Sequence, residues 1–252
     1  MSDDNLLQLI DSEIGRLAPV DLAAELVRIP SHPGIERQEE RVVMALARFF
    51  GERDLGVQLE EVLPGRANLL VSIAGSLPGP HLLLCGHTDT VPLNSGDPGV
   101  GLSGEIREGR LLGRGSVDMK GALAAMASAV VALSRHLPAG RVSFAAVIDE
   151  EMESLGAEQL VDTSFRADGA VVGEPTSNRI ALGHKGLEWL EVHFQGKSAH
   201  GGIPDKGINA ISAAGMFLAM VENELKPRLL ARRHPILGPP TINFGTIRGG
   251  DQ

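Results

Sequence analysis

The chain has 252 residues, enough for one large domain or two smaller ones. Hydrophobic residues make up 43% of it, which allows a sizeable core, and the formal net charge is −9. This negative charge, without any run of basic residues, argues against nucleic acid or an anionic membrane as a partner. The single cysteine, Cys85, excludes a disulfide within the chain, and its apolar neighbours predict a buried strand residue.

The sequence shows no signal for export or membrane insertion. Residues 1–5 are acidic and lack the apolar stretch of a signal peptide. The longest apolar run, residues 121–133, is rich in alanine and too short to span a bilayer. We therefore expect a cytoplasmic protein, which also fits the single cysteine.

The first 178 residues have the pattern of a layered α/β domain. Apolar residues at helical spacing predict helices over residues 6–17, 22–29 and 39–50. Short apolar segments bounded by glycine or proline predict strands over residues 57–62, 68–74, 81–86, 142–148 and 170–172. Residues 121–133 are predicted to be a buried helix. In α/β sheets of this kind, ligands bind at the carboxyl ends of the strands.

A second, smaller α/β unit is expected to begin near residue 179. Its pattern predicts a strand over residues 187–194, a glycine-rich loop over 196–202, a helix over 208–225 and a strand over 241–247. The predicted domains are therefore residues 1–178 and residues 179–252.

Acidic residues and one histidine recur where the predicted strands of the first domain end. They are His87 with Asp89, Asp118 after a glycine-rich turn, the pair Glu150 and Glu151, and Glu174. Each has an ordinary structural explanation alone, as a strand-end pair, a helix-start carboxylate, a solvated turn or an edge acid. Together, one neutral imidazole and several carboxylates at one sheet edge favour a divalent metal site, zinc above all. The two oxygens of Asp118 could also bridge two ions.

The spacing of these residues suggests different roles. His87 and Asp89 lie two apart, so on an extended backbone both point to the same side, and Asp89 can orient the ring of a metal-bound His87. Glu150 and Glu151 are adjacent and cannot both point the same way, so one can bind metal while the other acts as a general base. The neighbouring Asp149 is expected to be structural.

Five motifs together have the pattern of one known family. They occupy residues 87–92, 113–121, 149–151, 173–176 and 196–204. In these motifs the chain resembles the co-catalytic zinc amidohydrolases, the family of acetylornithine deacetylase, succinyl-diaminopimelate desuccinylase, aminoacylase and glutamate carboxypeptidase. The resemblance implies an α/β, zinc-peptidase-like catalytic domain with an inserted, smaller ferredoxin-like domain that serves as lid and dimerisation surface.

The resemblance also implies a role for each motif residue. His87, Asp118 and Glu174 would hold one zinc ion, and Asp118 would bridge it to a second ion held by Glu151. Asp89 would steer His87, Glu150 would be the general base, and His200 would stabilise the oxyanion, from the partner subunit in dimeric members. Two Zn²⁺ ions are expected, with Co²⁺ or Mn²⁺ as substitutes. The implied reaction is hydrolysis of the amide bond of an N-acylated amino acid or small peptide by a homodimer.

In this family the lid continues after the glycine pair at residues 249–250, and a later segment supplies a histidine to the second metal. We therefore expect the sequence to be truncated at its C-terminus, with His184 as a minor candidate for the missing ligand. Two alternatives stay open: a carboxypeptidase or aminopeptidase of the same family, and a catalytically impaired fragment that binds metal and dimerises.

Overall fold

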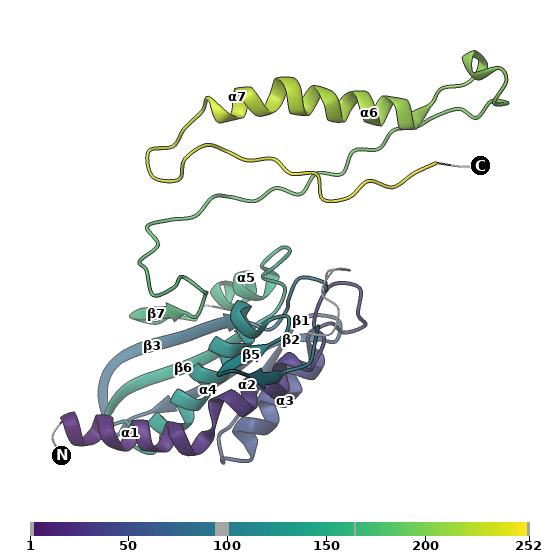
Figure 1. Ribbon diagram of the computed structural model, residues 1–252. Coiled ribbons are helices and arrows are strands. Elements are labelled where there is room, and N and C mark those ends of the chain that lie inside the picture. Colours follow the sequence, from purple (N-terminus) through teal and green to yellow (C-terminus); the bar gives the residue numbers. More distant parts are fainter. Residues whose placement is uncertain (1–2, 94–100, 164, 251–252) are drawn as a thin grey trace. The chain divides into compact units, whose positions relative to one another are not determined.

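The computed structural model describes residues 3–93, 101–163 and 165–250 (Figure 1). Met1 and Gln252, the two ends of the sequence discussed above, lie outside the described residues. The chain divides into two compact units, Met1–Ser177 and Asn178–Gln252, called here the first and second unit.

A five-stranded mixed sheet forms the centre of the first unit (Figure 1). In spatial order its strands are β1 (Gln58–Leu63), β2 (Arg66–Ala74), β6 (Ala139–Val147), β3 (Leu77–His87) and β7 (Gly169–Val172). β2 pairs antiparallel with both β1 and β6, whereas β3 pairs parallel with both β6 and β7. Because β3, β6 and β7 run in one direction, their carboxyl ends meet at the same edge of the sheet.

Helices cover both faces of this sheet. α2 (Pro19–Val27), α3 (Glu40–Gly51) and α4 (Gly121–Ser134) pack on one face, α1 (Asp3–Leu17) packs on α4, and α5 (Leu155–Asp162) packs on the other face. Phe144 of β6 belongs to the core under α2–α4, whereas its neighbour Ala145 packs with Leu160 of α5. Successive side chains of a strand point to opposite faces, so a strand covered on both sides is apolar throughout.

α4 is the central helix of this core. Together with the preceding turn, the stretch Ser116–Ser134 is long and apolar enough to cross a membrane by length and composition alone, with a mean hydropathy of 1.4. This apolar stretch is longer than residues 121–133, the run identified from the sequence. However, 56% of this window is buried within the structure, and Leu123, Ala127 and Val130 are completely buried. The apolar character of α4 is explained by its place in the core.

The helices and strands predicted for the first unit are all present, with their ends shifted by a few residues, and the mixed α/β class is confirmed. Among the described residues, the sequence pattern did not predict the hairpin of β4 (Glu105–Arg107) and β5 (Arg110–Leu112), nor α5. β4 and β5 have only three residues each, and α5 buries only Gly156 and Leu160. Elements this short or this little buried leave no clear hydrophobic period.

The second unit contains one long helix. It runs through α6 (Ala210–Met220), the π-helical turn η3 (Val221–Leu225) and α7 (Lys226–Leu230), so the helix predicted over 208–225 is confirmed and continues beyond it (Figure 1). The side chain of Asn209 caps its start by accepting the Ser212 N–H at 2.9 Å.

The two strands predicted for the second unit, over residues 187–194 and 241–247, are wrong. Neither segment forms a β-ladder with any described part of the chain. Among its described residues, the second unit has two isolated β-bridges, Lys197–Ile208 and His234–Gly238. A β-like apolar pattern gives a strand only when a partner takes up its backbone hydrogen bonds.

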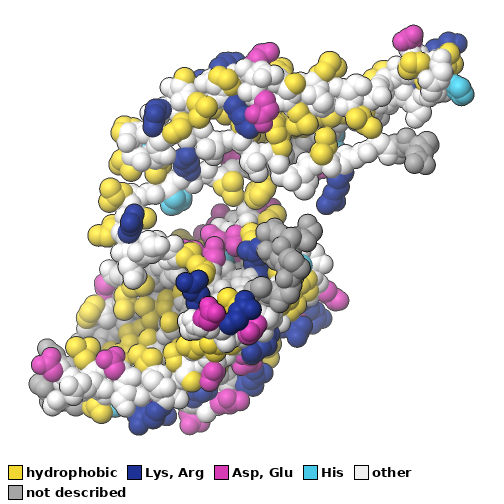
Figure 2. All heavy atoms as spheres, viewed as in Figure 1, with side chains coloured by type: hydrophobic (Ala, Val, Ile, Leu, Met, Phe, Trp, Pro, Cys, Tyr) yellow, Lys and Arg dark blue, Asp and Glu magenta, His cyan; other side chains and the backbone are white. Residues whose placement is uncertain are grey.

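Hydrophobic side chains lie over much of the surface of the second unit (Figure 2). Leu187, Trp189 and Leu190, in the first of these segments, are 68%, 65% and 81% exposed. The described residues of this unit therefore do not establish a ferredoxin-like sheet, and its role as a lid and dimerisation domain stays a prediction.

Candidate metal centre

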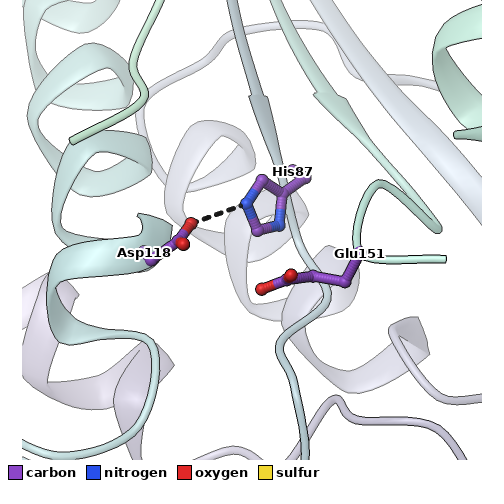
Figure 3. Close-up of side chains that lie close together, drawn as sticks. All are labelled: His87, Asp118 and Glu151. Atoms are coloured by element: carbon purple, nitrogen blue, oxygen red, sulfur yellow. Dashed lines mark hydrogen bonds and ion pairs between the residues drawn. The ribbon is translucent and has the colours of Figure 1, made fainter. Parts of the chain in front are cut away.

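Three strand ends and one helix start bring the candidate ligands together. His87 is the last residue of β3, the pair Glu150–Glu151 follows β6, and Glu174 follows β7. Asp118 differs from the expectation, because it follows no strand of this sheet and lies in the kinked turn η1 (Ser116–Lys120) that leads into α4, where its own backbone is extended (φ −124°, ψ 98°). Figure 3 shows His87, Asp118 and Glu151 with their side chains directed toward a common space.

The Nε2 atom of His87 is shared by two groups of possible ligands. It lies 3.0 Å from Asp118 Oδ1, 3.7 Å from Glu150 Oε2 and 3.7 Å from Glu174 Oε1. The ligand atoms of His87, Asp118 and Glu151 lie within 4.8 Å of one another, and so do those of His87, Glu150 and Glu174. Ligands of a tetrahedral zinc ion lie about 2.0–2.2 Å from the ion and therefore roughly 3.3 Å from each other. The donor types and their spacing thus fit a divalent metal.

The two groups do not follow the division of ligands that the family resemblance implies. That division pairs Glu174 with His87 and Asp118, and it reserves Glu150 for proton transfer. In the structure Glu174 groups with Glu150, and Glu151 groups with His87 and Asp118. The assignment of each carboxylate to an ion or to proton transfer therefore stays a prediction.

Asp89 is completely buried and contacts both His87 and the acid pair. The Nδ1 of His87 lies 3.0 Å from the carbonyl oxygen of Asp89 and 3.3 Å from its carboxylate. A proton on Nδ1 directed at these acceptors leaves Nε2 as the free nitrogen that a metal requires. The same carboxylate accepts the backbone N–H of Glu150 at 3.1 Å and that of Glu151 at 2.9 Å. This second contact was not indicated by the sequence.

The cluster concentrates negative charge that a cation would offset. Burial and then the charge of Asp118 raise the pKa of Glu151, and burial and like-charged neighbours raise the pKa of Glu174 although His87 opposes this. Burial alone would lower the pKa of His87, but Asp89 and the other acids raise it to about 9. A metal ion that binds His87 therefore competes with a proton for the ring.

Lys120 and Arg66, two basic residues near the cluster, were missed by the sequence analysis. Lys120 is completely buried, donates to the carbonyl of Ile29 at 2.6 Å, and has its pKa lowered to about 7 by burial, against the charge of Asp89. Arg66 at the start of β2 donates to Glu39 and to Asp149, which lie 27 and 83 positions away. Partners this distant in sequence leave no local pattern to detect.

The remaining candidates, His200 and His184, belong to the second unit. The Nδ1 of the exposed His200 accepts the N–H of Gly202 at 3.0 Å. A neutral imidazole that accepts at Nδ1 carries its proton on Nε2, so His200 presents an N–H donor. The Nδ1 of His184 lies 3.1 Å from the carbonyl of Lys185. The roles of both residues at the cluster stay predictions.

Known proteins resemble this chain in sequence over most of its length. The acetylornithine deacetylase of Proteus mirabilis (strain HI4320) is 32% identical over 246 residues, which cover 92% of this chain and 62% of that protein. The acetylornithine deacetylase of Photorhabdus laumondii is 34% identical over the same coverage. The chain therefore spans about three fifths of the length of these relatives.

Solved structures show the same fold at lower sequence identity. Human carnosine dipeptidase 1 superposes with a TM-score of 0.53 at 22% identity, over 67% of this chain and 40% of that one. Aminopeptidase PepT from Bacillus cereus gives a TM-score of 0.51 at 23% identity, over 80% of this chain and 55% of that one.

The family model of peptidase family M20/M25/M40 matches residues 83–233, more than half of the chain. This range begins in β3, just before His87, and includes every candidate ligand. The chain belongs to peptidase family M20/M25/M40.

Proposed function

We propose that this chain carries the metal centre of a zinc-dependent hydrolase that cleaves the amide bond of N-acylated amino acids. The observation that carries the proposal is the cluster of four carboxylates around His87 Nε2 at the carboxyl edge of the sheet. Relatives named acetylornithine deacetylase, at 32–34% identity, favour an N-acyl amino acid over other amides.

The proposed ligands follow from the donor set and the resemblance. His87, Asp118 and Glu174 would hold one ion, and Asp118 and Glu151 would hold a second. The side chain of Asp118 is half exposed, and its Oδ1 lies 3.0 Å from His87 Nε2. Its other oxygen can therefore face a second ion. Zinc held by these residues would supply Lewis-acid chemistry, which polarises an amide carbonyl and lowers the pKa of water.

Glu150 is the proposed general base. Its side chain is 43% exposed, and Oε2 lies 3.7 Å from His87 Nε2, so its carboxylate borders the cluster and can also reach solvent. Glu150 takes a proton from the attacking water and delivers it to the nitrogen of the leaving amine. The proposed role of His200 is to donate its Nε2–H to the oxyanion that forms on the carbonyl carbon. Following the family resemblance, the active form is proposed to be a homodimer.

A substrate panel tests this proposal. Zinc-loaded protein is expected to release the amine from N-acetylornithine and other N-acetyl or N-succinyl amino acids, with dipeptides much slower. The same protein after chelation, and again after zinc is restored, serves as the control. Hydrolysis of dipeptides alone would replace the proposal by a peptidase of the same family. Turnover that survives complete removal of metal would contradict the proposal.

A further inference from the structure

The turn that carries Glu150 and Glu151 has an unfavourable backbone conformation at its first residue. Asp149 has a φ of +66°, in the left-handed region that residues other than glycine rarely adopt. Its carbonyl accepts the N–H groups of Glu153 at 3.2 Å and Ser154 at 2.6 Å, which close the turn. Because Glu150 and Glu151 follow directly, the conformation of Asp149 decides where both side chains point.

Arg66 holds the side chain of Asp149. One guanidinium nitrogen of Arg66, Nη2, donates to Asp149 Oδ1 at 2.8 Å and to Glu39 Oε1 at 2.5 Å, and Nε donates to Glu39 Oε2 at 2.7 Å. The side chain of Glu39 is 0% exposed, that of Asp149 is 7% exposed and that of Arg66 is 18% exposed. The hydrogen bond that Arg66 donates to Glu39, and then the one that it donates to Asp149, raise the pKa of Arg66 although burial lowers it. The guanidinium is thus clamped in one orientation by Glu39 and presents a fixed donor to Asp149.

Asn68, two residues along β2, closes the same turn at its base. Its Oδ1 accepts the N–H of Ile148 at 3.1 Å, and its Nδ2 donates to the carbonyl of Gly156 at 2.8 Å. Gly156 N–H in turn donates to the carbonyl of Ile148 at 3.2 Å. Three side chains therefore hold the turn in place. Asn68 binds its two ends, Arg66 binds its first residue, Asp149, and Asp89 accepts the N–H groups of Glu150 and Glu151.

Fold stability alone is a poor explanation for a mostly buried arginine between two buried acids. The desolvation of buried charges offsets most of their attraction, and apolar side chains of similar size often stabilise a protein equally well. A fixed guanidinium, by contrast, supplies directional hydrogen bonds that an apolar side chain cannot replace.

We propose that Arg66, clamped by Glu39, is a positioning residue that holds Asp149 in its left-handed conformation and thereby aims Glu150 and Glu151 at the metal cluster. This inference rests on the proposed function. Arg66 itself touches neither the candidate ligands nor, on this account, the substrate.

The test compares Arg66→Met, which keeps the aliphatic stem but removes the guanidinium, with Arg66→Lys, which keeps the charge but not the fork. Asp149→Asn keeps an acceptor and tolerates the left-handed conformation, whereas Asp149→Ala loses both. Arg135→Met is the matched control, because Arg135 pairs with the buried Glu13, where α1 packs on α4. For each variant, thermal unfolding, Co²⁺ affinity, the visible absorption spectrum of bound Co²⁺, and kcat and KM are measured.

Arg66→Met and Asp149→Ala are expected to change the Co²⁺ spectrum and to weaken Co²⁺ binding by about 10- to 100-fold. Loss of a residue that orients metal ligands usually has an effect of this size. Their kcat should fall by more than their KM changes. Arg66→Lys should be intermediate, Asp149→Asn should resemble the wild type, and Arg135→Met should keep spectrum and kcat even if it unfolds at a lower temperature.

A wild-type Co²⁺ spectrum, affinity and kcat in folded Arg66→Met would overturn the inference. If that variant does not fold, the Asp149 pair decides: equal behaviour of Asp149→Asn and Asp149→Ala would also overturn it. The spectral comparison needs no substrate. A wild-type protein that binds Co²⁺ but hydrolyses no amide would refute the proposed function and still leave the role of Arg66 testable.

Discussion

Replacing Glu150 with glutamine is expected to remove most amide hydrolysis while leaving metal binding in place. Glutamine keeps the size of the side chain and the backbone N–H that Asp89 accepts, but it cannot take a proton. A general base contributes about 100- to 10,000-fold to the rate, and kcat should fall by that factor. Zinc content and turnover on an N-acetyl amino acid are measured on the same sample.

This variant also decides between two roles that the structure allows for Glu150. Its Oε2 lies in one ligand group with His87 and Glu174, so it could bind metal. If Glu150 is a ligand, Glu150→Gln should lose metal along with activity, and if it is neither base nor ligand, both should survive. Glu153→Gln is the matched control, because Glu153 is an exposed acid of the same turn outside both ligand groups.

Replacing His200 with alanine is expected to lower kcat by about 100- to 1,000-fold with a much smaller change in KM and no loss of metal. An oxyanion donor acts mainly in the transition state, and removal of one such donor has an effect of this size. The Nε2–H that this role needs follows from the hydrogen bond of Gly202 to Nδ1. Steady-state kinetics and zinc content of the variant provide the check.

His193→Ala is the control for His200, because His193 is an exposed histidine of the same unit that pairs with Glu191 at 3.3 Å. A change confined to KM would show that His200 only binds substrate. If dimeric family members are a guide, mixed dimers of His200→Ala and Glu150→Gln subunits should regain part of the activity. Without any recovery in confirmed mixed dimers, His200 would have to act within its own subunit.

The fold and the site differ in how far local sequence predicts them. β3, β6 and β7 are apolar runs whose ends carry His87, the acid pair and Glu174, so the hydrophobic pattern predicts the sheet and the place of four of the five cluster residues. The approach of Asp118 depends on the turn η1, for which the sequence indicated only a glycine-rich connection.

Contacts between distant residues were beyond the reach of the sequence. The hydrogen bonds of Arg66 to Glu39 and Asp149 connect β2, the start of α3 and the turn after β6. No local sequence period links these positions. The strands predicted over 187–194 and 241–247 do not form, for a related reason. The apolar pattern of these two segments indicates that each could form a strand. Strand formation also requires a neighbouring strand as partner, which the pattern does not identify.

We propose that the acids around His87 form a divalent-metal site, and a calorimetric titration of metal-free protein with Zn²⁺ tests this proposal. Both ligand groups include His87. The wild type should therefore bind zinc tightly, and folded His87→Ala should lose that binding. A folded wild type that takes up no zinc, or equally tight binding in His87→Ala, would contradict the claim.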